Sequence, residues 1–139
     1  MNYWKVFEIS EEQYGKGIPY VSIGHNRMCF NKAACDLINV RNNGYRFAQF
    51  LVNEENKNLI GVRFWKAEYE SKISNSVPLM QKESKGKPIG GVDIANSNLL
   101  KAIFGLVVAN KNTTKFRVRR DEIFDHTLVI DVNRSIGKK

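Results

Sequence analysis

The clearest chemical pattern in the sequence is the run of cations KFRVRR at residues 115–120. If this run is a strand, Lys115, Arg117 and Arg119 share one face and repeat about every 6.6 Å, because successive side chains alternate. That repeat is close to the spacing of phosphates along a nucleic-acid strand. The run therefore predicts a basic strand ridge that neutralises phosphates, with Arg120 beside it. An exposed face kept soluble by Lys and Arg stays open as the alternative, because acidic residues follow at once.

A second group of cations lies in the stretch 71–88, which is poor in apolar residues. Lys82, Lys85 and Lys87 surround a glycine-containing turn there. One interpretation is a solvated hairpin. The other is a basic arm in which Lys85 and Lys87 assist the ridge near a phosphate.

The residue types used in acid–base catalysis do not form a recognisable constellation. His25 and His126 both stand beside turn-forming residues, which favours exposed loop histidines. The carboxylate pairs Glu54–Glu55 and Asp121–Glu122 occur at expected hairpin tips, where neighbouring side chains point to opposite faces. We therefore expect no catalytic residue and no enzyme activity.

Cofactor and metal motifs are also missing from the sequence. The glycine-containing stretches 15–17 and 85–87 do not follow the phosphate-binding P-loop pattern. Cys29 and Cys35 have five residues between them, which fits neither a metal site nor a disulfide framework. We expect two small buried thiols in a reducing cytosol, with no metal and no cofactor.

Net charge favours an anionic partner. The 139 residues carry a formal charge of +8 at pH 7. Residues 1–70 contain nine basic and eight acidic side chains, whereas residues 71–139 contain thirteen and six. The second half should therefore carry most of any polyanion binding. No apolar run has the length of a signal peptide or a membrane span, so we expect a cytoplasmic protein with no membrane partner.

The elements that position these residues occur twice in the same order. In the first half, two strands precede a short helix that Asn31 caps, and a hairpin with the polar turn 53–57 follows. The expected strands are 4–10, 19–24 (extended or followed by 27–30), 45–52 and 58–65, and the expected helix is 32–39. In the second half, the expected strands are 76–84, 88–95, 115–120 and 127–132, and the helix begins at Asn96 or Ser97 and ends near Gly105.

The two segments correspond position by position. An offset of 66 carries the helix 31–38 onto 97–104, and an offset of 68 carries the strand positions 50–64 onto 118–132. We therefore expect an α+β fold made by tandem duplication of a ββαββ unit, with one repeat at 1–70 and a more basic one at 71–139. The two repeats would pack or interleave into one compact body. The alternative is that the two segments, each with strands and a helix, agree by chance.

A strand pair, a short helix opened by a polar cap, and a closing hairpin resemble the AbrB and SpoVT swapped-hairpin family. The resemblance rests mainly on residues 21–64, and with the second copy it is similar to the tandem, MraZ-type members. It implies a barrel-like body that binds DNA. Where family members have a proline before the helix and an arginine within it, this sequence has Asn31 and the stretch 32–38, so no DNA-contacting arginine is carried over.

Aromatic residues flank several expected strand ends: Tyr3, Trp4, Trp65 and Tyr69. They either stack on unpaired bases or pack at the margins of the core. Taken together, these features predict a DNA-binding regulator or accessory protein, with DNA favoured over RNA. The alternatives are an interaction module that docks on an acidic protein, and an assembly protein that forms homo-oligomers through exposed strand edges.

Overall fold

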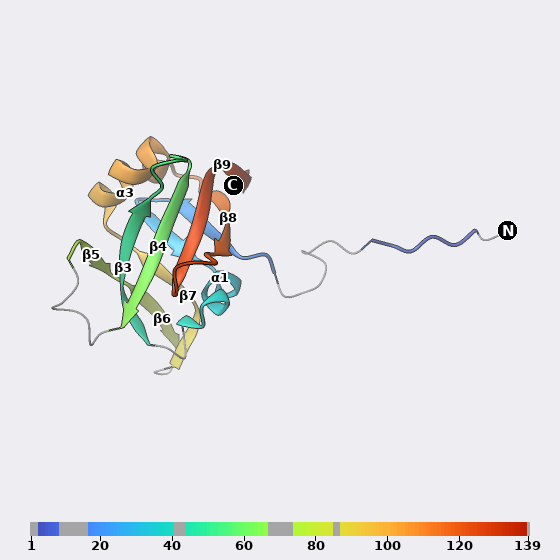
Figure 1. The fold of residues 1–139 in the computed structure, drawn as a ribbon, viewed down its shortest axis with the longest axis horizontal. Coiled ribbons are helices and arrows are strands. Elements are labelled where there is room, and N and C mark those ends of the chain that lie inside the picture. The colour runs from blue at the N-terminus through green and yellow to red at the C-terminus, as the bar shows by residue number, and fades with distance from the viewer. Residues whose placement is uncertain (1–2, 9–16, 41–43, 67–73, 85–86, 139) are drawn as a thin grey trace.

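The computed structural model describes residues 3–8, 17–40, 44–66, 74–84 and 87–138. Its nine strands form one antiparallel sheet with the order β5-β3-β4-β9-β8-β1-β2-β7-β6. The strands are β1 (Tyr20–Gly24), β2 (Arg27–Phe30), β3 (Tyr45–Val52), β4 (Leu59–Lys66), β5 (Ser76–Pro78), β6 (Met80–Ser84), β7 (Lys87–Ile94), β8 (Thr114–Arg120) and β9 (Thr127–Lys138). The sheet curls around an apolar interior, so the body is a nearly closed barrel (Figure 1).

Alternation of buried and partly buried residues along β4 separates the core from the outer surface. Ile60, Val62 and Phe64 point inward and are at most 5% exposed. The residues between them, Gly61 and Arg63 among others, are only partly buried. Burial of the apolar face holds the barrel together, since each fully buried large side chain contributes about 1.5–3 kcal/mol.

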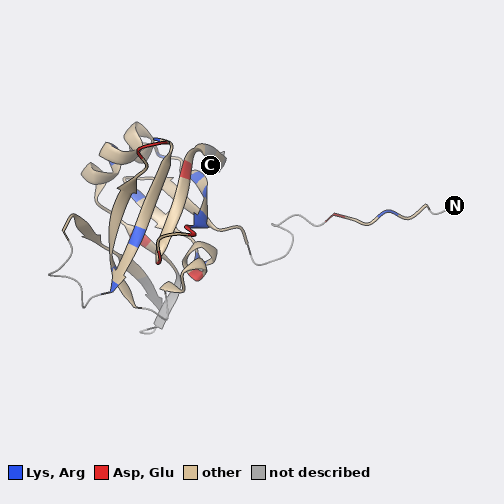
Figure 2. Ribbon diagram, in the orientation of Figure 1, with Lys and Arg blue, Asp and Glu red and all other residues tan. Residues whose placement is uncertain are grey.

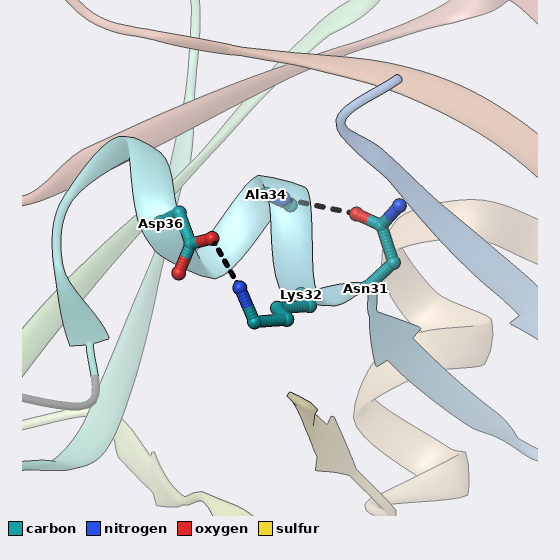
Figure 3. Close-up of polar contacts among 4 residues, drawn as sticks. All are labelled: Asn31, Lys32, Ala34 and Asp36. Atoms are coloured by element: carbon teal, nitrogen blue, oxygen red, sulfur yellow. Dashed lines mark hydrogen bonds and ion pairs between the residues drawn. The ribbon is translucent and has the colours of Figure 1, made fainter. Parts of the chain in front are cut away.

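The α-helices α1 and α3 are short and are each opened by an asparagine; the sequence predicts Asn31 for the first and offers Asn96 or Ser97 for the second. Helix α1 (Lys32–Leu37) begins after Asn31, whose Oδ1 accepts the N–H of Ala34 at 2.9 Å (Figure 3). Helix α3 (Ser97–Phe104) begins after Asn96, whose Oδ1 accepts the N–H of Leu99 at 3.1 Å. A 3-10 helix, η3 (Gly105–Ala109), follows directly. The positive φ of Gly105, 76°, ends α3 where the sequence places its end.

The expected α+β fold class, a tandem of ββαββ units, is wrong. The described residues consist mainly of strands in one continuous sheet, and helices α1 and α3 contain only six and eight residues. Strands from the two halves pair directly, since β1 pairs with β8 and β4 pairs with β9. Alternation within a segment predicts a strand but not its distant neighbour, which is why the sheet was not foreseen. The expected boundary between the repeats falls in 67–73, outside the described residues.

The first expected strand pair is also wrong. Within the expected strand 4–10, residues 4–8 form neither helix nor strand, and 9–10 lie outside the described residues. The segment 3–8 lies apart from the barrel (Figure 1). Instead, β1 pairs with β2 across a turn at His25 and Asn26, whose φ values are 53° and 62°. Two consecutive positive φ angles make a turn whose twist matches that of an antiparallel hairpin.

The expected strand 76–84 is split at one residue, Leu79. Strand β5 pairs with β3 at one edge of the sheet, and β6 pairs with β7 at the other edge. The N–H of Leu79 donates to the carbonyl oxygen of Arg46 at 2.8 Å. One extended segment therefore joins both edges of the sheet and closes the barrel covalently.

Candidate nucleic-acid interface

The predicted basic strand is β8, in the middle of the sheet between β9 and β1. Phe116 and Val118 point into the core and are each 6% exposed, whereas Arg117 and Arg119 are exposed on the outer face. The predicted strand and its alternation are confirmed at these positions. Arg117 pairs with Tyr20 on β1 and Arg119 pairs with Val129 on β9, so the backbone of each arginine is held by a neighbouring strand. Figure 2 shows cations on β8 and also on β4.

The other two cations of β8 lie at its ends. The Nζ of Lys115 lies 4.6 Å from the ring centroid of Tyr20 on β1, so this half-buried lysine is held against an aromatic ring. Arg120 is the last residue of β8 and is exposed. We name the outer-face residues Lys115, Arg117 and Arg119 the β8 ridge.

The side chains of the second predicted cluster, Lys82, Lys85 and Lys87, lie outside the described part of the chain, so its role stays a prediction. Lys85 lies outside the described residues. Lys87 begins β7, and its side chain is also outside the described part of the chain. Two strands, β1 and β2, separate β7 from β8 in the sheet.

A hollow of about 550 Å³ lies beside the β8 ridge on the outer surface. Arg117 and Arg119 line it, together with Leu59 and Val129. Asp131 is the acidic residue in its lining, and its Oδ1 accepts the N–H of Asn133 at 3.0 Å. The hollow therefore combines an apolar floor with two arginines and one carboxylate.

A second hollow, of about 130 Å³, shares Leu59, Arg119 and Val129 with the first, so the two lie side by side. Gly61 lines this hollow. Phe124, which is 54% exposed, also lines it. Phe124 comes from the loop between β8 and β9, in which Asp121 Oδ2 accepts its N–H at 2.7 Å.

A third hollow, of about 240 Å³, lies at the far end of β4 and is lined by Arg63, Trp65 and His126, among others. The guanidinium carbon of Arg63 lies 4.4 Å from the ring centroid of Trp65. Trp65 Nε1 donates to Oε1 of Gln49 at 2.7 Å, which fixes the orientation of the indole. His126 is exposed in its loop, as the sequence predicts, and its Nδ1 also forms a hydrogen bond with the hydroxyl of Tyr45.

The two cysteines are not joined by a disulfide: Cys35 is buried and Cys29 is half-buried. Burial is the main cause that raises the pKa of the Cys35 thiol to about 11. Within the described residues, no group of three His, Cys, Asp or Glu side chains is arranged to hold a metal ion. None of the helices described has the length and apolar character needed to cross a membrane.

Comparison of the chain with family models, with curated proteins and with solved structures finds no match. The resemblance to the AbrB and SpoVT family stays a prediction.

Residues on β4 and β9 complete this surface, and sequence reasoning did not assign them to it. Gly61 and Arg63 occupy alternate positions of a strand that the sequence does predict. The missing information was the pairing of β4 with β9, which sets Leu59 opposite Asp131 and Gly61 opposite Val129. No local signal specifies that pairing, because the two strands are far apart in the chain.

Proposed function

We propose that this protein is a non-enzymatic DNA-binding protein, a regulator or accessory factor, that contacts phosphates through the β8 ridge. The observation that supports this most directly is the exposure of Arg117 and Arg119 at alternate positions of a central strand. The alternate residues of the same strand, Phe116 and Val118, are buried in the core and hold β8 in place. A guanidinium group donates two parallel hydrogen bonds to a phosphate, so arginine suits this task.

In the proposed function, the free energy of DNA binding comes mainly from neutralisation of phosphate charges. Each cation that contacts a phosphate of duplex DNA releases condensed counterions, and the slope of log K against log salt changes by about 0.9 per contact. The formal charge of +8 favours the approach of a polyanion at low ionic strength. Asp131 in the adjacent hollow opposes only part of this attraction, since two arginines line the same hollow.

The test replaces Lys115, Arg117 and Arg119 together by glutamine and measures DNA affinity as a function of salt. If all three contact phosphates, the salt slope on duplex becomes shallower by about 2.7, and affinity falls similarly for every sequence. Glutamine keeps the polarity of the exposed positions 117 and 119, so stability changes there by no more than about 0.5 kcal/mol per site, whereas the half-buried Lys115 also loses its contact with Tyr20, worth about 0.5–1 kcal/mol.

A matched control replaces three exposed cations on other elements by glutamine: Lys32 on α1, Arg46 on β3 and Lys101 on α3. This variant has the same net charge as the first, so only a specific role of the β8 ridge makes the two differ. Equal salt slopes in both variants would place the contact surface elsewhere. If the wild-type protein does not bind DNA at ~50 mM salt, where cationic proteins bind most readily, DNA binding is refuted and the acidic-protein partner becomes the better hypothesis.

A further inference from the structure

The three hollows follow one strand along the outer surface of the barrel. Leu59 lines the first two hollows, Gly61 lines the second, and Arg63 and Trp65 line the third. These residues alternate along β4, and the distance from the first to the last is about 20 Å at 3.3 Å per residue. We name this surface the β4 groove.

The lining of the β4 groove changes along its length. Its first part has an apolar floor, with Val129 and Leu59, and two arginines beside it. Its last part holds the indole of Trp65 with the guanidinium of Arg63 stacked on it. Duplex DNA presents phosphates but hides the faces of its bases. Apolar and aromatic surface next to cations is what binds the exposed base faces of a single strand.

We propose that the β4 groove binds single-stranded DNA, with bases against its apolar and aromatic lining and phosphates toward Arg117 and Arg119. This inference rests on the proposed function, because it takes the β8 ridge as the phosphate-contacting wall. It adds the choice of a single strand over a duplex and a site for the bases.

Gly61 lies in the middle of the β4 groove, where the side chain of its partner Leu51 on β3 packs over it. A Cβ atom added at this position would lie 3.2 Å from the Cβ of Leu51, so any side chain there narrows the second hollow. Phe124 lines the same hollow from the loop between β8 and β9. The second hollow is thus lined by apolar side chains, Leu51, Leu59, Phe124 and Val129, against which we propose that an unstacked base packs.

Tryptophan fluorescence provides a direct test, because the chain contains only Trp4 and Trp65. Trp4 is 89% exposed on the N-terminal segment and does not line the groove, so Trp4→Phe leaves Trp65 as the single reporter. Addition of oligothymidylate at low salt is expected to quench the fluorescence of this variant, with saturation at the affinity measured by anisotropy. Saturable binding that leaves the fluorescence unchanged would overturn the proposed position of the bases.

Two substitutions in the groove and one control complete the test. Trp65→Leu is expected to weaken oligothymidylate binding about tenfold, the effect of losing one stacked base, and Trp65→Phe restores most of it. Gly61→Val crowds Leu51 and narrows the second hollow, so its stability is measured first by urea denaturation; at a protein concentration and temperature where it is folded, it is expected to weaken binding several-fold. Trp4→Leu, the matched control, leaves the affinity unchanged. Losses that are equal on single strand and duplex would refute a base-specific role.

The comparison of single-stranded with duplex DNA separates this inference from the proposed function. Tighter binding of the single strand, lost on Trp65→Leu, supports both. Equal or tighter binding of the duplex overturns the single-strand inference and leaves the proposed function intact. Absence of binding to either form overturns the proposed function itself.

Discussion

The hydroxyl of Tyr45 and Nδ1 of His126 form a hydrogen bond between residues that are 81 positions apart in the chain. Tyr45 is the buried first residue of β3, and His126 is the last residue of the loop between β8 and β9. The carbonyl oxygen of His126 also accepts the N–H of Phe64 on β4 at 2.8 Å. The loop that carries Phe124 over the β4 groove is therefore fixed at its end to both β3 and β4.

The first prediction concerns this bond. Tyr45→Phe keeps the buried ring but removes the hydroxyl, so we expect the free energy of unfolding to fall by about 1 kcal/mol. Urea denaturation measures the change. Tyr3→Phe makes the same substitution at a residue that is 87% exposed and is expected to leave stability unchanged. An identical midpoint for Tyr45→Phe and the wild type would show that the bond contributes nothing.

The second prediction compares the two helix caps. Asn31 Oδ1 accepts N–H groups from both Ala34 and Tyr20, and Asn31 Nδ2 donates to the carbonyl of Ile18 at 2.9 Å. The side chain of Asn96 accepts from Leu99, the one bond described for it. Asn31→Ala is therefore expected to lower the free energy of unfolding by about 2–3 kcal/mol, and Asn96→Ala to lower it by about 1 kcal/mol. Equal losses in thermal or urea unfolding would contradict the role of Asn31 in joining α1 to β1.

The third prediction concerns pH and the thiol of Cys35. Its buried position, with smaller contributions from Asp36 and Asp93, raises its pKa from 9.0 to about 11. The folded pKa is above the unfolded one, so the folded state holds this proton more tightly. Its contribution to stability is complete below pH 9.0 and is lost as the pH rises toward about 11.

Unfolding free energies of the wild type and Cys35→Ala provide the measurement. We expect the difference between the two proteins to be constant from about pH 7 to 8.5 and to shrink above pH 9.0. A difference that stays constant up to pH 11 would mean that the thiol ionises equally well in the folded protein.

The fourth prediction concerns Gly91, which lies against the end of β2. A Cβ atom at this position would lie 1.8 Å from the carbonyl oxygen of Phe30, a backbone atom that cannot turn away. Gly91→Ala is therefore expected to cost about 3 kcal/mol, the upper range for overpacking. Gly105→Ala meets no atom within 4 Å and is strained only by its φ of 76°, so we expect about 1 kcal/mol there. Urea denaturation measures both variants. Similar losses of unfolding free energy in the two would contradict the close approach between Gly91 and Phe30.

Local features of the fold were predictable because local chemistry determines them. The capping of α1 by Asn31, the end of α3 at Gly105 and the alternation of β8 each depend on a few neighbouring residues. The hairpin of β3 and β4 follows the predicted pairing, with Ala48 opposite Phe64.

Long-range pairing was not predictable from the same signals. The segment 4–10 has the composition of a strand, but its described residues 4–8 form no strand, and β1 pairs with β2 and β8 instead. The β8 ridge was therefore foreseen, whereas its neighbours across β9, Gly61 among them, were not. The candidate site depends on which strands pair with one another. No short segment of the sequence specifies that pairing.

The single residue between β5 and β6 has a consequence for the motions of the barrel. Leu79 links β5, which pairs with β3, to β6, which pairs with β7. If one of these edge strands detaches from its neighbour, it therefore displaces the other. Opening at this seam should be a concerted event rather than fraying from one side. We expect the amide protons of Val77 and Leu79 and those of β6 to exchange with solvent at similar rates in native-state hydrogen exchange. A barrel closed in this way breathes as one unit, and insertion of a flexible glycine linker at Leu79 should release the two edges to exchange independently.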